Sequence, residues 1–177
     1  DGGVVYATGG DNGGAGIGGS FATRDSGTSE NRDGGTVTIN NGEVTAMGNG
    51  GGAGIGGALF GNGGTVNING GTVVAEGGKS GVGIGGSLEG ADVTIKGGSV
   101  TATGGFYSDD TKRADGIGAG PLGKDPGTLT IVPQGSSYIV NVGTGSAAAS
   151  QIKGSPFETQ AEIISLVEGN PYFSCRQ

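Results

Sequence analysis

The sequence predicts an all-β fold, a right-handed parallel β-helix (β-solenoid) with three short strands per coil and about four to five coils. Three observations lead to this fold class. One strand motif recurs four times, short Gly- and Asn-containing turns join it to a second strand, and a Gly-Ile-Gly block follows each second strand. Self-similarity at a spacing of about 30 residues is the signature of a solenoid. We therefore expect each strand to pair with its copy in the next coil.

Glycine is the most abundant residue type, with 46 of 177 residues, and only 5 residues are proline. Without a period, this composition is typical of disordered or low-complexity chains. Glycines that recur at the same place in each repeat form turns instead, so the spacing reverses that interpretation. The formal net charge is −7, and no cluster of Lys or Arg offsets it. This charge does not favour nucleic-acid binding.

The first strand of each coil has an apolar residue at every second position. In the first copy Val37 and Ile39 face one way, and Thr36 and Thr38 face the other. A period of two places the apolar set in the core and the polar set in solvent. The four copies are predicted at residues 35–40, 64–69, 91–96 and 127–132.

The second strand of each coil follows a Gly/Asn turn and shows the same alternation. It is predicted at residues 43–47, 72–76 and 99–103, and residues 4–8 are an earlier copy that lacks its first strand. The chain thus begins inside a coil and presents an open strand edge, which invites pairing. We expect the N-terminal coil to be incomplete and the chain to be part of a longer solenoid.

The third block of each coil is centred on an isoleucine, Ile17, Ile55, Ile84 or Ile117. If each isoleucine faces inward, the flanking outward positions are all glycine. A surface without side chains permits close approach of another backbone, so we expect self-association against a second solenoid or a covering segment. The alternative is that tight corners alone select glycine. The residues of this candidate packing face are Gly16, Gly18, Gly54, Gly56, Gly83, Gly85, Gly116 and Gly118.

The repeats are predicted to occupy residues 1–142 and a C-terminal region residues 143–177. In the C-terminal region, Ser155 and Pro156 are typical of a helix start, and Gly169 followed by Pro171 is typical of a helix end. We expect this short helix to cap the last coil. Cys175 is the only cysteine, so it forms no internal disulfide, and it is expected to be a free thiol or part of a disordered tail.

Catalysis is not expected. The chain has no His, which excludes Ser-His-Asp and Cys-His constellations and His-based zinc sites. Glycosidase chemistry needs two carboxylates that converge on one bond, and the acidic residues of the strands do not recur as pairs. Lys96 near Asp92 is a weak indication of lyase chemistry.

One insertion, after the last copy of the second strand, is the candidate ligand loop. Its carboxylates could hold Ca²⁺ while its aromatic side chains stack on a sugar ring. The alternative is that Lys112 and Arg113 neutralise the acids of a solvated loop. No other cofactor is expected. The candidate residues are Phe106, Tyr107, Asp109, Asp110 and Asp115.

Outward threonines on the first strands form a candidate Thr face. Flat rows of Thr on a solenoid can order water, so ice binding is a third hypothesis. The alternative is that Thr is simply a favourable strand residue. The candidate residues are Thr36, Thr38, Thr65, Thr94, Thr128 and Thr130.

The units Gly-Gly-Ala-Gly-Ile-Gly-Gly (51–57) and Gly-Thr-Val-Thr-Ile-Asn-Asn-Gly (35–42) resemble the glycine-rich β-helix repeats of secreted or wall-attached surface proteins of anaerobic Gram-positive bacteria. The resemblance covers residues 3–132, and the segments 154–157 and 172–173 are similar to the way those arrays end. More distantly, the chain resembles calcium-dependent, pectin-binding β-helix proteins. The resemblance implies display at the cell surface and leaves the ligand open.

The sequence therefore favours a non-catalytic, extracellular structural or adhesive segment of a bacterial surface protein. A carbohydrate-binding module is the alternative. Expected partners are a glycan, a host or cell-surface protein, or a second copy of the chain.

Overall fold

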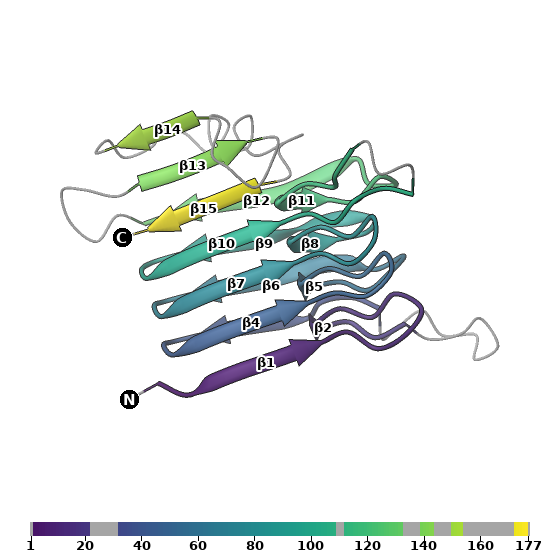
Figure 1. The fold of residues 1–177 in the computed structure, drawn as a ribbon, viewed down its shortest axis with the longest axis horizontal. Coiled ribbons are helices and arrows are strands. Elements are labelled where there is room, and N and C mark those ends of the chain that lie inside the picture. Colours follow the sequence, from purple (N-terminus) through teal and green to yellow (C-terminus); the bar gives the residue numbers. More distant parts are fainter. Residues whose placement is uncertain are drawn as a thin grey trace.

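The computed structural model describes residues 2–21, 32–108, 112–132, 139–143, 150–153 and 172–176. Every regular element in these ranges is a β-strand, as the sequence predicted, and the strands form three sheets in a solenoid-like stack (Figure 1). Nothing in the described ranges resembles a membrane-crossing helix. The expected capping helix at 155–169 lies outside the described residues.

The largest sheet, sheet A, contains the four strands that the sequence predicted at residues 4–8, 43–47, 72–76 and 99–103. Its first four strands run parallel to one another. Each of the last three strands pairs antiparallel with the strand before it in the sheet. In spatial order the strands are β1 (Val4–Thr8), β4 (Glu43–Met47), β7 (Thr72–Glu76), β10 (Ser99–Thr103), β15 (Tyr172–Arg176), β13 (Ile139–Gly143) and β14 (Ser150–Lys153).

The other two sheets are entirely parallel. Sheet B contains β2 (Ile17–Gly18), β5 (Ile55–Gly56), β8 (Ile84–Gly86) and β11 (Ile117–Ala119). Sheet C contains β3 (Thr36–Ile39), β6 (Asn62–Ile68), β9 (Glu89–Ile95) and β12 (Asp125–Ile131). Each of the strands β1 to β9 pairs with the strand three further along the chain, so β1–β3, β4–β6, β7–β9 and β10–β12 are four stacked repeats.

Identical residues stack on one another from repeat to repeat. In sheet B, for example, Ile17 pairs with Ile55, Ile55 with Ile84, and Ile84 with Ile117. The side chains of Ile55 and Ile84 are fully buried. The alternation of period two thus produces columns of inward Val, Ala and Ile that form one core, as predicted.

The Gly/Asn turns between sheets C and A require glycine. Gly42, Gly71 and Gly98 have φ of 98°, 88° and 86°, a region that side chains with a Cβ rarely adopt. A Cβ on Gly71 would also overlap the Gly42 carbonyl oxygen of the previous repeat. The turn glycines therefore provide both the left-handed backbone and the close spacing of adjacent turns.

The C-terminal segment differs from the predicted tail. Residues 172–176 form strand β15, which pairs antiparallel with β10 on one side and with β13 on the other (Figure 1). Cys175 lies opposite Val100, is only 1 % exposed and belongs to the core. Its thiol is free, as expected, but it is not in a disordered tail. The prediction missed β15 because its sequence does not repeat any earlier strand.

Candidate functional site

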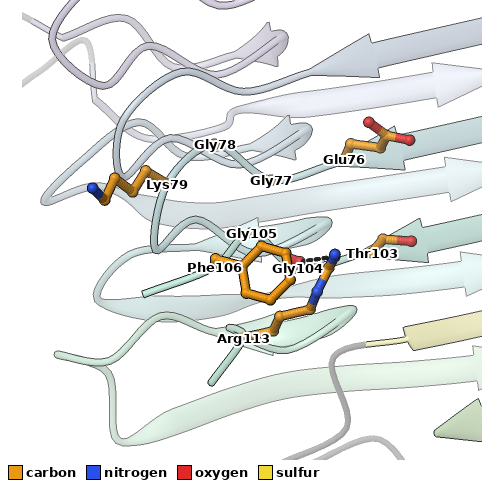
Figure 2. A pocket seen from close by; sticks show the side chains of 9 residues that line it. All are labelled: Glu76, Gly77, Gly78, Lys79, Thr103, Gly104, Gly105, Phe106 and Arg113. Carbon is orange, nitrogen blue, oxygen red and sulfur yellow. Dashed lines mark hydrogen bonds between the residues drawn. The ribbon is translucent and has the colours of Figure 1, made fainter. Parts of the chain in front are cut away.

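A pocket of about 530 Å³ lies where the chain leaves sheet A in the third and fourth repeats (Figure 2). Adjacent turns form its walls, since Gly77 N donates to Thr103 O at 2.8 Å and Ser80 N donates to Phe106 O at 2.8 Å. The lining residues are Glu76, Gly77, Gly78 and Lys79 after β7, Thr103, Gly104, Gly105 and Phe106 after β10, and Arg113.

Phe106 and Arg113 are held together at the base of the insertion. They form an antiparallel bridge, and Ala114 N donates to Gly105 O at 2.9 Å. The guanidinium carbon of Arg113 lies 3.8 Å from the centre of the Phe106 ring, within the range of a cation–π contact. Arg113 Nη1 also donates to Gly104 O at 3.1 Å. Two backbone interactions thus hold the two residues together, and two side-chain interactions hold the guanidinium against the ring.

The pocket combines an aromatic ring with side chains of both charges. Phe106 is 44 % exposed, and Figure 2 shows Lys79 to the upper left and Glu76 to the upper right of the ring. Thr103 adds a hydroxyl at the end of β10. The site therefore offers a ring for stacking, donors from Lys79 and Arg113, and an acceptor from Glu76.

The structure separates the predicted loop residues. Phe106 lines the 530 Å³ pocket, whereas Tyr107 and Asp115 line a neighbouring pocket of about 300 Å³. Tyr107 packs against a small apolar cluster that includes Val82 and Ala114. Burial raises the pKa of the Tyr107 hydroxyl, and the charge of Asp115 adds to this effect.

The carboxylates needed for the calcium hypothesis are only partly described. Asp109 and Asp110 lie outside the described residues, and Asp115 faces the smaller pocket. Within the ranges that the structure describes, no three His, Cys, Asp or Glu side chains are grouped to hold a metal ion. The calcium hypothesis stays a prediction.

Sequence reasoning missed three residues of the pocket. Arg113 was considered only as a neutralising charge, and Glu76 and Lys79 were not considered as ligands. The signal was present, because Glu76-Gly-Gly-Lys79 and Thr103-Gly-Gly-Phe106 occupy equivalent positions of adjacent repeats. Because β7 and β10 pair with Glu76 opposite Thr103, the turns that follow these two strands lie side by side.

The expected packing face of bare glycines is not formed. Gly54, Gly56, Gly83, Gly85, Gly116 and Gly118 are buried, Gly16 is half-buried, and Gly18 alone is exposed. A Cβ on Gly56 would overlap the carbonyl oxygen of Gly85 in the next repeat. The glycines permit close contact between repeats of the same chain. This agrees with the alternative that tight corners select glycine at these positions. The strands of these blocks have only two or three residues, too few for a regular inward and outward alternation.

The structure does bring the six predicted threonines together on sheet C. They occupy two ranks that run across the four strands, on the face opposite the buried Val and Ile residues. Asp92 interrupts one rank, where it accepts a 2.7 Å hydrogen bond from Thr128 Oγ1, and Asn67 interrupts the other. The ranks are Thr36, Thr65, Asp92 and Thr128, and Thr38, Asn67, Thr94 and Thr130.

The stacked parallel sheets and the repeated strand register define a β-helix class of protein. A family model described as a beta helix repeat matches residues 1–21, 37–59, 66–88 and 93–121, which together are more than half of the chain. The chain therefore belongs to the beta helix repeat family. Comparisons with curated proteins and with solved structures find no match.

Proposed function

We propose that this chain is a non-catalytic structural and adhesive segment of an extracellular bacterial surface protein. The supporting observation is a pocket carried by turns of a rigid, repetitive scaffold, an arrangement that binding proteins often use. The proposal includes a Gram-positive source and a right-handed path of about four to five coils. In it, residues 1–142 display the pocket and residues 143–177 close the stack.

The scaffold suits adhesion because its loops are held by many backbone hydrogen bonds. The pocket walls follow β7 and β10, which are paired over their full five-residue length. Pre-organised groups lose little conformational freedom when a partner binds. Phe106 is thus a fixed aromatic anchor, and Arg113 supports it.

Adhesion can be tested by displaying the chain on a non-adherent bacterium and measuring attachment to host cells and glycan-coated surfaces. We expect the chain to raise attachment and Phe106→Ala to abolish most of the gain. Phe60→Ala is the matched control, because Phe60 is 46 % exposed at a different corner and should leave attachment unchanged. Equal attachment with and without the displayed chain would reject the proposal.

The second candidate function is carbohydrate binding in the same pocket. It is favoured by the exposed Phe106 ring beside hydrogen-bonding groups of both kinds, which suits a hydroxyl-rich ring that needs stacking and polar contacts. A glycan array followed by calorimetry with and without Ca²⁺ tests it. We expect Phe106→Ala to weaken a bound glycan about tenfold or more. Adhesion that persists without any glycan signal would instead indicate a protein partner.

A third candidate function, ice binding, is favoured by the two outward Thr ranks of sheet C. An ice-recrystallisation assay tests it directly. Thr65→Lys should reduce any inhibition, whereas Thr101→Lys on sheet A should not. Crystal growth equal to that in buffer removes this candidate.

A further inference from the structure

The pocket that contains Phe106 differs in charge from the chain as a whole. The chain has 16 acidic and 9 basic side chains and a formal net charge of −7. Among the described residues that line the pocket, by contrast, Lys79 and Arg113 are basic and Glu76 is acidic. Lys112, which precedes Arg113, is exposed. A local excess of positive charge on an acidic chain attracts anionic ligands.

The positive charge of Arg113 lies directly beside the aromatic ring. Its guanidinium carbon is 3.8 Å from the centre of the Phe106 ring, and Figure 2 shows the carboxylate of Glu76 pointing away from that ring. The contacts that the structure describes for the guanidinium are to this ring and to Gly104 O, and neither partner carries a negative charge. A ligand that packs against Phe106 therefore meets a cation.

We propose that the pocket binds an acidic glycan, whose carboxylate or sulfate group pairs with the guanidinium of Arg113 while the sugar ring that carries it packs against Phe106. The inference rests on carbohydrate binding, the second candidate function, and specifies the class of glycan. The pocket volume of about 530 Å³ is within the range of small-ligand sites.

The guanidinium of Arg113 is suited to binding an oxyanion. A guanidinium has five N–H donors in one plane, and Nη1 of Arg113 donates to Gly104 O at 3.1 Å. Two oxygens of a carboxylate or a sulfate match two parallel N–H groups of such a plane. The ring contact and the bond to Gly104 hold the side chain before a ligand arrives, so binding costs it little rotamer freedom.

A neutral sugar should bind more weakly than an acidic one. It stacks on the Phe106 ring, which is 44 % exposed, but it offers the guanidinium only uncharged acceptors. Charge-assisted hydrogen bonds are about twice as strong as neutral ones. We therefore expect a preference for acidic glycans that falls as salt screens the charges.

The test compares glycans that differ in the charged group alone, by calorimetry with the full chain. Sialyllactose is compared with its methyl ester, hyaluronan oligosaccharides with their carboxyl-reduced forms, and sulfated lactose with lactose. The first two pairs test a carboxylate and the third tests a sulfate. In at least one pair, the acidic member should bind about tenfold more tightly than the neutral member at about 0.1 M salt, and most of this preference should disappear at about 1 M.

Variants of the pocket identify the group that recognises the anion. Arg113→Gln should remove the acidic preference, and Arg113→Lys, which keeps the charge without the planar fork, should weaken acidic binding several-fold. Phe106→Ala should weaken the acidic and neutral members equally. Lys124→Gln is the matched control, because it removes one positive charge from the neighbouring pocket of about 300 Å³ and should leave the preference unchanged. Circular dichroism checks that each variant keeps the wild-type fold.

Equal affinities for the acidic and neutral members of every pair would overturn this inference and leave carbohydrate binding standing. A preference that survives both Arg113→Gln and Arg113→Lys would place the anion elsewhere and would also overturn it. Failure of every glycan to bind would overturn both this inference and the second candidate function.

Discussion

The two ends of the parallel part of sheet A, β1 and β10, carry the same inner residues but differ in how they are covered. Val5 at the β1 end is 46 % exposed, whereas Val100, in the same column at the β10 end, is fully buried. The difference is β15, an antiparallel strand with no repeat motif that places Cys175 over Val100. At the β10 end, a strand of a different kind therefore covers the last inner valine of the parallel stack.

The largest expected effect compares one core column at an inner and at an end position. Ile84→Ala should destabilise the fold by about 4 kcal/mol, because Ile84 is fully buried and its removal leaves a cavity. Ile17→Ala, in the same column at the open end, should cost about half as much. Urea unfolding of both variants measures the difference. Equal losses would show that the open end is covered in solution.

A second pair of variants tests how closely the repeats approach each other. Gly85 has φ of 145°, and a Cβ there would overlap Gly118 O of the next repeat. We expect Gly85→Ala to cost about 3 kcal/mol through strain and displaced backbone. Gly10, in the first repeat, has nothing within 4 Å of a new Cβ, so Gly10→Ala should be nearly neutral. Similar thermal denaturation midpoints for both variants would contradict this view of the glycines.

The covered end should respond to alkaline pH. Burial raises the pKa of the Cys175 thiol to about 11, so the unfolded chain loses this proton at lower pH than the folded chain does. The contribution is complete below the unfolded pKa and is lost as pH rises through about 11, with a total on the order of 2 kcal/mol.

Denaturant unfolding between pH 8 and 11 measures this loss of stability. Cys175→Ala should show a shallower decline, and Tyr107→Phe serves as a control because the raised pKa of Tyr107 acts in the same direction. A wild-type slope identical to that of Cys175→Ala would mean that the thiol is not buried.

The smallest expected effect concerns side chains that join the first two repeats on their outer surface. Asn69 Nδ2 donates to Asn40 Oδ1 at 2.8 Å. Because the pair is exposed, Asn69→Ala should cost only about 0.5–1 kcal/mol. Lys96→Ala, at the equivalent place in the third repeat, is the control and should be neutral. Chemical denaturation resolves the two, and a loss above that for Gly85→Ala would be inconsistent with an exposed bond.

The sequence predicted the repeated strands well because each prediction was supported by several copies. The alternation at Val37 and Ile39 recurs in register in sheet C, so a single strand could not be misplaced without breaking the column. The candidate site was harder to predict. Phe106 was identified from its place in an insertion, but its contact with Arg113 depends on how the loop closes on itself.

Two parts of the fold could not be predicted for physical reasons. β15 has no copy elsewhere in the chain, and its pairing joins residues far apart in sequence, which no local pattern reports. The Gly-Ile-Gly blocks contain strands of only two or three residues, too short for an alternation argument to hold. Positive φ values at Gly56 and Gly85 decide their geometry instead.

The place of β15 between β10 and β13 also orders events during synthesis. Among the strands that the structure describes, β13 (Ile139–Gly143) pairs with β15 and β14 and not with a strand of the repeats, so its strand pairing reaches the repeats once residues 172–176 have left the ribosome. The four repeats can stack while the chain is still growing. β15 then pairs with β10 on one side and with β13 on the other. If translation stops after β13, the edge of β10 stays exposed to neighbouring chains.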